Sequence, residues 1–218
     1  MAKGLDTATP CSQGTIDAII QAGYTFIVRY YCTGNLSKRL KLEEAQRLSD
    51  SGLWVVSVFQ DYNNSISRFS VPLGKANAKS AHEYASCVIG QPCETPIYFA
   101  VDFDATDGEA KGAVRDYFEA INSAFATAIA EGRYKVGVYG SGAVCRYIKD
   151  DAKLAEYSWL SMSTGWRGYR DYNGQNRWNL KQIKAIEING VEFDTNESNP
   201  VGGGGWRIRA GTAGIREK

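Results

Sequence analysis

Short apolar runs alternate with amphipathic stretches along the whole chain, which predicts strands that are each followed by a helix. The apolar runs predict strands over residues 4–8, 26–31, 54–60, 97–104, 134–140, 157–163, 180–183 and 191–196. Apolar positions at helical spacing predict helices over residues 12–22, 41–51, 75–89, 109–130 and 143–149. Such alternation favours a parallel sheet with helices outside it.

The number of predicted strands decides between two kinds of α/β fold. Eight strands in 218 residues favour a closed barrel over an open sheet. No glycine-rich phosphate loop follows the first strand, so a dinucleotide fold is disfavoured and no cofactor is expected. We therefore expect an α/β fold with a single (β/α)8 TIM-like barrel, regular or irregular, over residues 1–200. A glycine-rich tail, residues 201–218, follows it.

Two segments fall outside the repeat. Residues 164–179 are aromatic and basic without clear periodicity, which is typical of a long active-site loop. The tail is expected to be flexible at its glycine-rich start, to dock back through Trp206 and Ile208, and to fray at its last residues.

Two aspartates end the fourth apolar run, whose sequence over residues 98–104 is YFAVDFD. Asp102 and Asp104 are two residues apart, so in a strand their side chains share one face. Neighbouring carboxylates repel, and burial raises the cost of ionising both. The pair therefore indicates a metal, a basic partner or acid–base chemistry.

Other predicted strand ends carry further polar and aromatic residues, and barrel enzymes place their chemistry at this end. Asp6 and Asp194 are further candidate catalytic carboxylates. The candidate substrate-binding residues are Arg29, Tyr31, Gln60, Tyr139, Trp159 and Gln182. Carboxylates among aromatic rings favour sugar cleavage, because acids serve the oxocarbenium-like transition state and flat rings pack on pyranose faces.

Several of these residues have a structural alternative. Asp6 and Asp194 each precede a threonine and could be turn residues. Arg29 could be a buried counter-ion for the acids. Trp159 could equally belong to the core. The pair formed by Asp102 and Asp104 is the hardest to explain structurally.

Composition excludes some partners. A net charge of +1 gives no reason to expect nucleic acid or an anionic membrane as a partner, and no apolar stretch reaches the roughly 18 residues of a membrane span. The five cysteines include no CxxC pair, so zinc spacing is poor and most are expected to be reduced and packed. The N-terminus lacks a secretory signal pattern, which predicts a cytoplasmic chain or one that acts outside after lysis or specialised export.

Five segments resemble a known family: GLDTATP, FIVRYY, YFAVDFDAT, VGVYGSGAVC and VEFDTN. They are similar to the glycoside-hydrolase-like TIM-barrel domain of bacterial exported proteins and phage-type lysins, which is related to the lysozymes of glycoside hydrolase family 25. The resemblance runs from about residue 4 to 197 and is most specific at YFAVDFD and VYGS. It implies an irregular barrel, a peptidoglycan-directed site and catalytic carboxylates at Asp6, Asp102, Asp104 and Asp194.

One position departs from the lysozyme pattern, because those relatives carry Asp-x-Glu where this chain has Asp102 and Asp104. Aspartate retracts the carboxyl by about 1.5 Å, one C–C bond, whereas catalytic geometry tolerates about 0.5 Å. Either the backbone at Asp104 therefore lies closer to the substrate, or the acid role of Asp104 is weakened, or that role has moved to another residue.

Three functions remain open at this point. The first is a muramidase-like hydrolase of peptidoglycan in which Asp104 is the proton donor and Asp102 stays ionised. The second is a glycan-binding module with the same cleft and no turnover. The third is a hydrolase that uses the four aspartates as Mg²⁺ or Ca²⁺ ligands. We favour the first, and expect a monomer with peptidoglycan or a related glycan as its partner and no bound metal.

Overall fold

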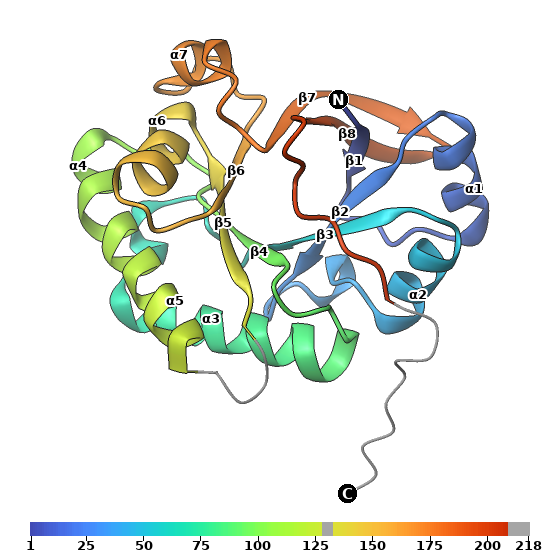
Figure 1. Ribbon diagram of the computed structural model, residues 1–218, viewed down its shortest axis with the longest axis horizontal. Helices are drawn as coiled ribbons and strands as arrows, with labels where there is room; N and C mark the ends of the chain where they lie inside the picture. Colours follow the sequence, from blue (N-terminus) through green and yellow to red (C-terminus); the bar gives the residue numbers. More distant parts are fainter. Residues whose placement is uncertain (128–132, 209–218) are drawn as a thin grey trace, which may run out of the picture.

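A closed barrel of eight strands forms the centre of the computed structural model, which describes residues 1–127 and 133–208 (Figure 1). The strands follow chain order around the barrel. They are β1 (Lys3–Asp6), β2 (Phe26–Tyr31), β3 (Trp54–Phe59), β4 (Pro96–Ala100), β5 (Lys135–Gly140), β6 (Tyr157–Leu160), β7 (Leu180–Ile188) and β8 (Val191–Ser198). The predicted α/β barrel is confirmed.

Helices surround the barrel on its outside (Figure 1). They are α1 (Gln13–Gln21), α2 (Leu42–Asp50), α3 (Val71–Glu83), α4 (Asp107–Glu109), α5 (Arg115–Thr127), α6 (Gly142–Cys145) and α7 (Tyr169–Gly174). The 3₁₀ turns are η1 (Leu36–Lys38) and η2 (Ile66–Arg68), and the π-helical segments are η3 (Tyr84–Ile89), η4 (Ala110–Val114) and η6 (Arg146–Asp151). Serine hydroxyls cap three of the helices by accepting a backbone N–H, at Ser12, Ser70 and Ser141.

The segment 164–179, expected to be a loop without regular structure, contains the short helix α7. The end of the helix predicted over 109–130, and the last residues expected to fray, lie outside the described residues.

The last two strands break the parallel pattern. β7 and β8 form a hairpin, and β8 pairs antiparallel with both β7 and β1. Its turn is Asn189–Gly190, with positive φ angles of 53° and 73°, which is the geometry that an Asn-Gly hairpin turn requires. The expected all-parallel sheet is thus wrong at this point, because a two-residue turn leaves no room for a crossover helix. The register places Asp194 opposite Asp6.

Alternating strand residues divide the core into two layers. Apolar side chains inside the barrel form one cluster, made by Phe26, Val28, Val56, Val58, Tyr98, Ala100, Trp159 and Leu180. The intervening residues, such as Ile27, Val55 and Phe99, belong to the larger cluster that includes the apolar residues of the helices. β4 ends at Ala100 rather than at residue 104, so strand alternation does not set the directions of Asp102 and Asp104.

The glycine-rich segment after β8 crosses the end of the barrel opposite the aspartates. Gly203 packs so closely on Leu180 that a Cβ would lie 2.3 Å from its side chain, and the Tyr98 hydroxyl donates to the Gly203 carbonyl at 3.0 Å. Trp206 then pairs with Val55 through two backbone hydrogen bonds of 2.8 Å. Its indole is 1% exposed. The predicted docking of Trp206 and Ile208 is confirmed, and this stretch is part of the core.

All five cysteines carry free thiols, and they lie in two settings. Cys11, Cys32 and Cys145 are buried, whereas Cys87 and Cys93 are exposed. The expectation that most are reduced and packed is confirmed.

We predict that Trp206→Ala lowers the free energy of unfolding by about 3–5 kcal/mol, because it empties a buried indole site. Val201→Ala is the matched control, since Val201 lies in the same segment and is 81% exposed. Chemical denaturation of both variants measures the difference. Equal stability of the two would mean that this segment does not stabilise the barrel.

Candidate active site

A cleft of about 300 Å³ opens at the carboxyl ends of the barrel strands. Its lining combines carboxylates, amides, hydroxyls and aromatic rings, contributed by Tyr30, Val58, Gln60, Ala100, Asp102, Tyr139, Trp159, Ser161, Met162, Ser163, Trp166, Gln182 and Asp194. Six of the ten predicted site residues therefore line one cavity directly, and Asp6 lies beside them because it accepts a hydrogen bond from Gln182.

Asp6 and Asp194 form one side of the site. The Gln182 amide donates to Asp6 Oδ2 at 3.1 Å and to Asp194 Oδ2 at 2.9 Å, and Asn196 donates to Asp6 Oδ2 at 2.7 Å. Burial raises the pKa of Asp6 to about 7; the Asp194 charge acts in the same direction, against the hydrogen bonds from Asn196, Gln182 and Tyr30. Burial also raises the pKa of Asp194, and the charge of Glu192 adds to this effect. This side can therefore hold a proton near neutral pH.

Asp102 forms a second acidic centre, and the amide of Gln60 bridges it to Lys38. Gln60 Nε2 donates to Asp102 Oδ2 at 2.9 Å, and Gln60 Oε1 accepts from Lys38 Nζ at 3.0 Å. Burial raises the pKa of Asp102, while the Gln60 hydrogen bond and the Lys38 charge oppose that rise. Burial lowers the pKa of Lys38. Its ammonium also lies 4.8 Å from the centroid of the Tyr30 ring.

Aromatic side chains connect the two acidic centres. The rings of Tyr139 and Trp159 lie 4.6 Å apart at 60°, and the Trp159 indole N–H donates to Asn196 at 2.8 Å. Burial raises the pKa of Tyr139, and the charges of Asp102, Asp6 and Asp194 raise it further. Tyr139 is thus within electrostatic range of all three carboxylates, and its hydroxyl donates to Gln182 at 3.2 Å.

Asp104 is held outside this arrangement. Its Oδ1 accepts the Arg167 backbone N–H at 2.8 Å and its Oδ2 accepts from the Arg167 guanidinium at 2.7 Å. It is not among the residues that line the cleft. The expectation that Asp102 and Asp104 share one face fails because β4 ends before both of them, and the intervening chain turns where Ala105 donates to the Phe103 carbonyl.

The side chains of β2 point in the opposite direction from the one predicted. Arg29 is fully buried, pairs with Glu44 at 2.8 Å and donates to the Thr7 carbonyl. Tyr31, also fully buried, donates to Gln91 at 2.8 Å. Both belong outside the barrel, and Tyr30 faces the cleft. The substrate-binding assignments of Arg29 and Tyr31 are therefore wrong. Arg29 is a buried counter-ion, as the structural alternative proposed, but its partner is Glu44 rather than the aspartates.

Four residues of the site were not predicted from the sequence. Lys38 comes from a 3₁₀ turn between strands, and Trp166 from the segment 164–179. Tyr30 could have been found by reversing the assumed face of β2. Asn196 follows Asp194 by two residues, and its same-face position on β8 was the available signal.

Neither a metal centre nor a membrane span is evident in the described residues. Within residues 1–127 and 133–208, no group of three or more His, Cys, Asp or Glu side chains could hold a metal ion. The metal-dependent alternative therefore lacks a ligand set in this part of the chain. Over the same ranges, no helix has the length and apolar character to cross a membrane.

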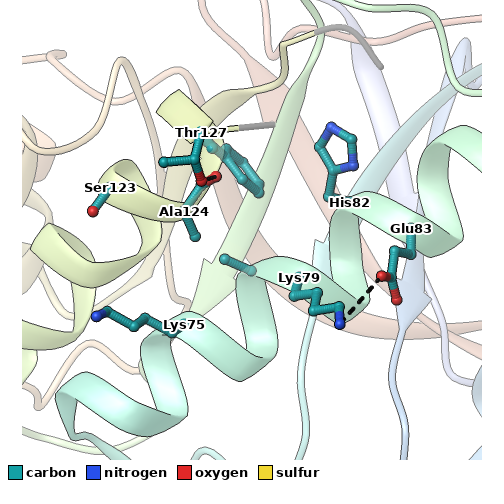
Figure 2. A pocket seen from close by; sticks show the side chains of 9 residues that line it. Lys75, Lys79, His82, Glu83, Ser123, Ala124 and Thr127 are labelled. Carbon is teal, nitrogen blue, oxygen red and sulfur yellow. Dashed lines mark hydrogen bonds and ion pairs between the residues drawn. The ribbon is translucent and has the colours of Figure 1, made fainter. Parts of the chain in front are cut away.

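A second hollow, of about 400 Å³, lies between α3 and α5 on the outside of the barrel. Figure 2 shows Lys75, Lys79, His82 and Glu83 on one helix facing Ser123 and Thr127 on the other. Lys79 and Glu83 form an ion pair at 3.7 Å. None of the predicted site residues lines this hollow, so the chemistry concentrates at the strand ends.

The sequence matches a family model described as an Rv2525c-like, glycoside hydrolase-like domain over residues 17–199. The chain belongs to this family. The resemblance inferred from the sequence is thereby confirmed. Asp102, Asp104 and Asp194 fall within the matched range of the Rv2525c-like domain, and Asp6 precedes it.

Two curated relatives illustrate the family. The uncharacterized protein YbfG of Bacillus subtilis is 36% identical over 193 residues, which cover 84% of this chain and 26% of YbfG. Rv2525c of Mycobacterium tuberculosis, named as a candidate peptidoglycan hydrolase, is 26% identical over 208 residues, or 90% of this chain and 82% of Rv2525c. This chain thus spans about a quarter of the length of YbfG but most of the length of Rv2525c.

Solved structures with the same fold include Rv2525c and a family 25 glycosyl hydrolase. The crystal structure of the Tat-secreted Rv2525c superposes with a TM-score of 0.78 at 24% identity, covering 94% of this chain and 98% of Rv2525c. The family 25 glycosyl hydrolase from Bacillus anthracis gives a TM-score of 0.55 at 14% identity, covering 92% of this chain and 91% of that enzyme. At these identities the likeness concerns the fold.

We predict that Asp6→Asn gains stability relative to the wild type as pH rises. The raised pKa of Asp6, about 7 against 3.8, means that the folded state holds a proton which the unfolded chain releases, so its contribution is fully present below pH 3.8 and is lost by pH 7. Asparagine does not titrate. Between pH 5 and pH 8 the difference in unfolding free energy should therefore move by about 2–3 kcal/mol in favour of the variant.

Denaturant unfolding at the two pH values measures this difference. Asp17→Asn, which removes an exposed carboxylate on α1, is the matched control. A difference for Asp6→Asn that does not change with pH would contradict a proton on Asp6.

Proposed function

We propose that this domain hydrolyses the β-1,4 glycan of peptidoglycan, with Asp102 and Asp194 as the two working carboxylates. The observation that carries the proposal is that these two acids line one cleft together with the rings of Tyr30, Tyr139 and Trp159. Glycosidases require two carboxyl groups that flank the scissile bond, and flat rings suit the faces of sugars. The Rv2525c relationship supports peptidoglycan as the substrate class.

Asp102 takes the role of general acid in this proposal. Its raised pKa, caused by burial, favours a carboxyl that still carries a proton when substrate binds. The sequence pattern assigned this role to Asp104, but the Asp104 carboxylate is engaged by Arg167 and does not line the cleft. The Gln60 amide holds Asp102 in position by donating to one of its oxygens.

Asp194 acts as the ionised partner that stabilises positive charge on the sugar ring. Asp6 lies opposite it in the strand register and is bridged to it by Gln182. With a pKa of about 7, Asp6 can carry the proton that two adjacent carboxyl groups would otherwise share, which leaves the negative charge on Asp194. The amide of Gln182 fixes the orientation of both groups.

The place of action follows from the substrate. Peptidoglycan lies outside the cytoplasmic membrane, and the relative Rv2525c is described as Tat-secreted. We therefore propose that the domain works at the cell wall.

We predict that Asp102→Asn reduces hydrolysis of purified cell walls by about 10²–10⁴-fold, the range for loss of a general acid. Turbidity loss and released reducing ends measure the rate. Asp17→Asn, which removes an exposed carboxylate on α1, should retain the wild-type rate. If Asp102→Asn hydrolyses as fast as the wild type, Asp102 is not the acid.

A binding module without turnover is the second candidate, and the pairing of Asp104 with Arg167 favours it. In the related lysozymes this position carries the acidic Glu, whereas here the carboxylate has both oxygens occupied. A binder would sediment with purified walls and release no reducing ends. Asp102→Asn would then weaken sedimentation without changing any rate.

We predict that Lys38→Met shifts the alkaline limb of the pH–rate profile to higher pH. The Lys38 charge lowers the pKa of Asp102, so its removal allows that pKa to rise. A general acid must be protonated to work, and a higher pKa keeps it protonated at higher pH. Lys111→Met, on the exposed helical face, is the control and should leave the profile unchanged. A profile that stays unchanged or moves to lower pH would contradict the effect of the Lys38 charge on the pKa of Asp102.

A further inference from the structure

The ion pair between Asp104 and Arg167 connects the chain that follows β4 to the segment that carries Trp166. We propose that Asp104 is a positioning residue: its pairing with Arg167 holds Trp166 as a stacking wall for the apolar face of an N-acetylhexosamine ring. This inference rests on the proposed function, because it assigns a sugar subsite in the same cleft. It gives Asp104 a structural task in place of proton transfer.

Three bonds join Asp104 to Arg167. The Arg167 backbone N–H donates to Asp104 Oδ1 at 2.8 Å, and the guanidinium donates to Oδ2 at 2.7 Å and to the Asp104 carbonyl at 3.0 Å. The pair is partly exposed, at 48% for Arg167 and 31% for Asp104, so its hold comes from three charge-assisted bonds that act together on backbone and side chain. Both carboxylate oxygens are thereby occupied, which leaves Asp104 poorly placed to transfer a proton.

A second set of contacts fixes the far side of Arg167. The Ala143 N–H donates to the Arg167 carbonyl at 2.9 Å. Gly142 lies so close that a Cβ there would be 2.2 Å from the Gly168 carbonyl oxygen. Gly168 itself has a φ of 70°, which favours glycine. Arg167 is therefore held between Asp104 on one side and the start of α6 on the other.

Trp166 directly precedes this clamped residue, and its position follows from the clamp. Its side chain lines the cleft, and its backbone N–H donates to the Ser163 carbonyl at 2.9 Å. Trp166 is only half-buried, unlike Trp159, which is 2% exposed. A held, partly exposed indole beside carboxylates suits the apolar face of a pyranose ring. Met162 and Ser163 line the cleft beside it.

Hydrogen exchange tests the clamp without any glycan or activity. In Asp104→Asn the Arg167 amide should exchange about tenfold faster, because a charge-assisted acceptor becomes a neutral one. Asp102→Asn is the matched control, since it neutralises a carboxylate two residues away that makes no bond to Arg167, and exchange at Arg167 should stay at the wild-type rate. Unchanged exchange in Asp104→Asn overturns the inference and leaves the proposed hydrolysis untouched.

Glycan affinity tests the subsite. Titration with a β-1,4-linked N-acetylglucosamine tetramer should give a Kd about tenfold weaker for Trp166→Ala and for Arg167→Met, and a Kd close to wild type for Arg167→Lys, which keeps the charge. If the protein hydrolyses cell walls, Asp104→Asn should raise KM and change kcat little. Loss of kcat at unchanged KM would identify Asp104 as the acid and overturn the inference. A Kd for Trp166→Ala equal to that of the wild type would also overturn the inference.

Discussion

Closure of the barrel by an antiparallel strand is the constraint on which the candidate site depends. β8 enters beside β1 from the opposite direction, and the register sets Asp194 against Asp6. Two carboxyl groups at adjacent strand positions in a buried setting cannot both be ionised cheaply. Burial raises the pKa of Asp6 and the charge of Asp194 adds to the rise, while the amides of Gln182 and Asn196 satisfy the oxygens that burial would otherwise leave without donors.

On the opposite side of the cleft a single partly buried carboxyl group, Asp102, is stabilised by an amide and a nearby ammonium. Asp102 has no second carboxylate bonded beside it; a single amide, Gln60, stands between it and the ammonium of Lys38. Burial raises the pKa of Asp102 while the distant charge limits the rise. Burial therefore raises the pKa of carboxyl groups on both sides of the cleft, opposed by Gln60 and Lys38 at Asp102 and reinforced by the charge of Asp194 at Asp6. Environments that differ in this way allow chemically similar carboxyl groups to take separate roles.

Asp104 occupies the position at which the resemblance to the lysozymes implies a glutamate, and the structure gives this aspartate a physical context. The carboxylate of Asp104 accepts the backbone N–H of Arg167 as well as its guanidinium. The neighbouring aspartate, Asp102, is the one that lines the cleft. The segment 164–179 is then joined to the barrel through Asp104 rather than lying loose over it, which links the end of β4 to the aromatic lining of the site.

Local patterns in the sequence were enough to predict the barrel, most helix positions and the grouping of Asp6, Asp102, Asp194, Gln60, Tyr139, Trp159 and Gln182, because apolar periodicity and strand ends are encoded within a few residues. Other features depended on tertiary contacts. β2 carries large side chains on both faces without a polar alternation, so packing against Glu44 decides that Arg29 points outward. The antiparallel entry of β8 depends on the hairpin turn, and Lys38 and Trp166 reach the cleft from segments without strand or helix periodicity. Asp102 and Asp104 look equivalent in the chain; the end of β4 at Ala100 and the guanidinium of Arg167, 63 residues further along the chain, make them different.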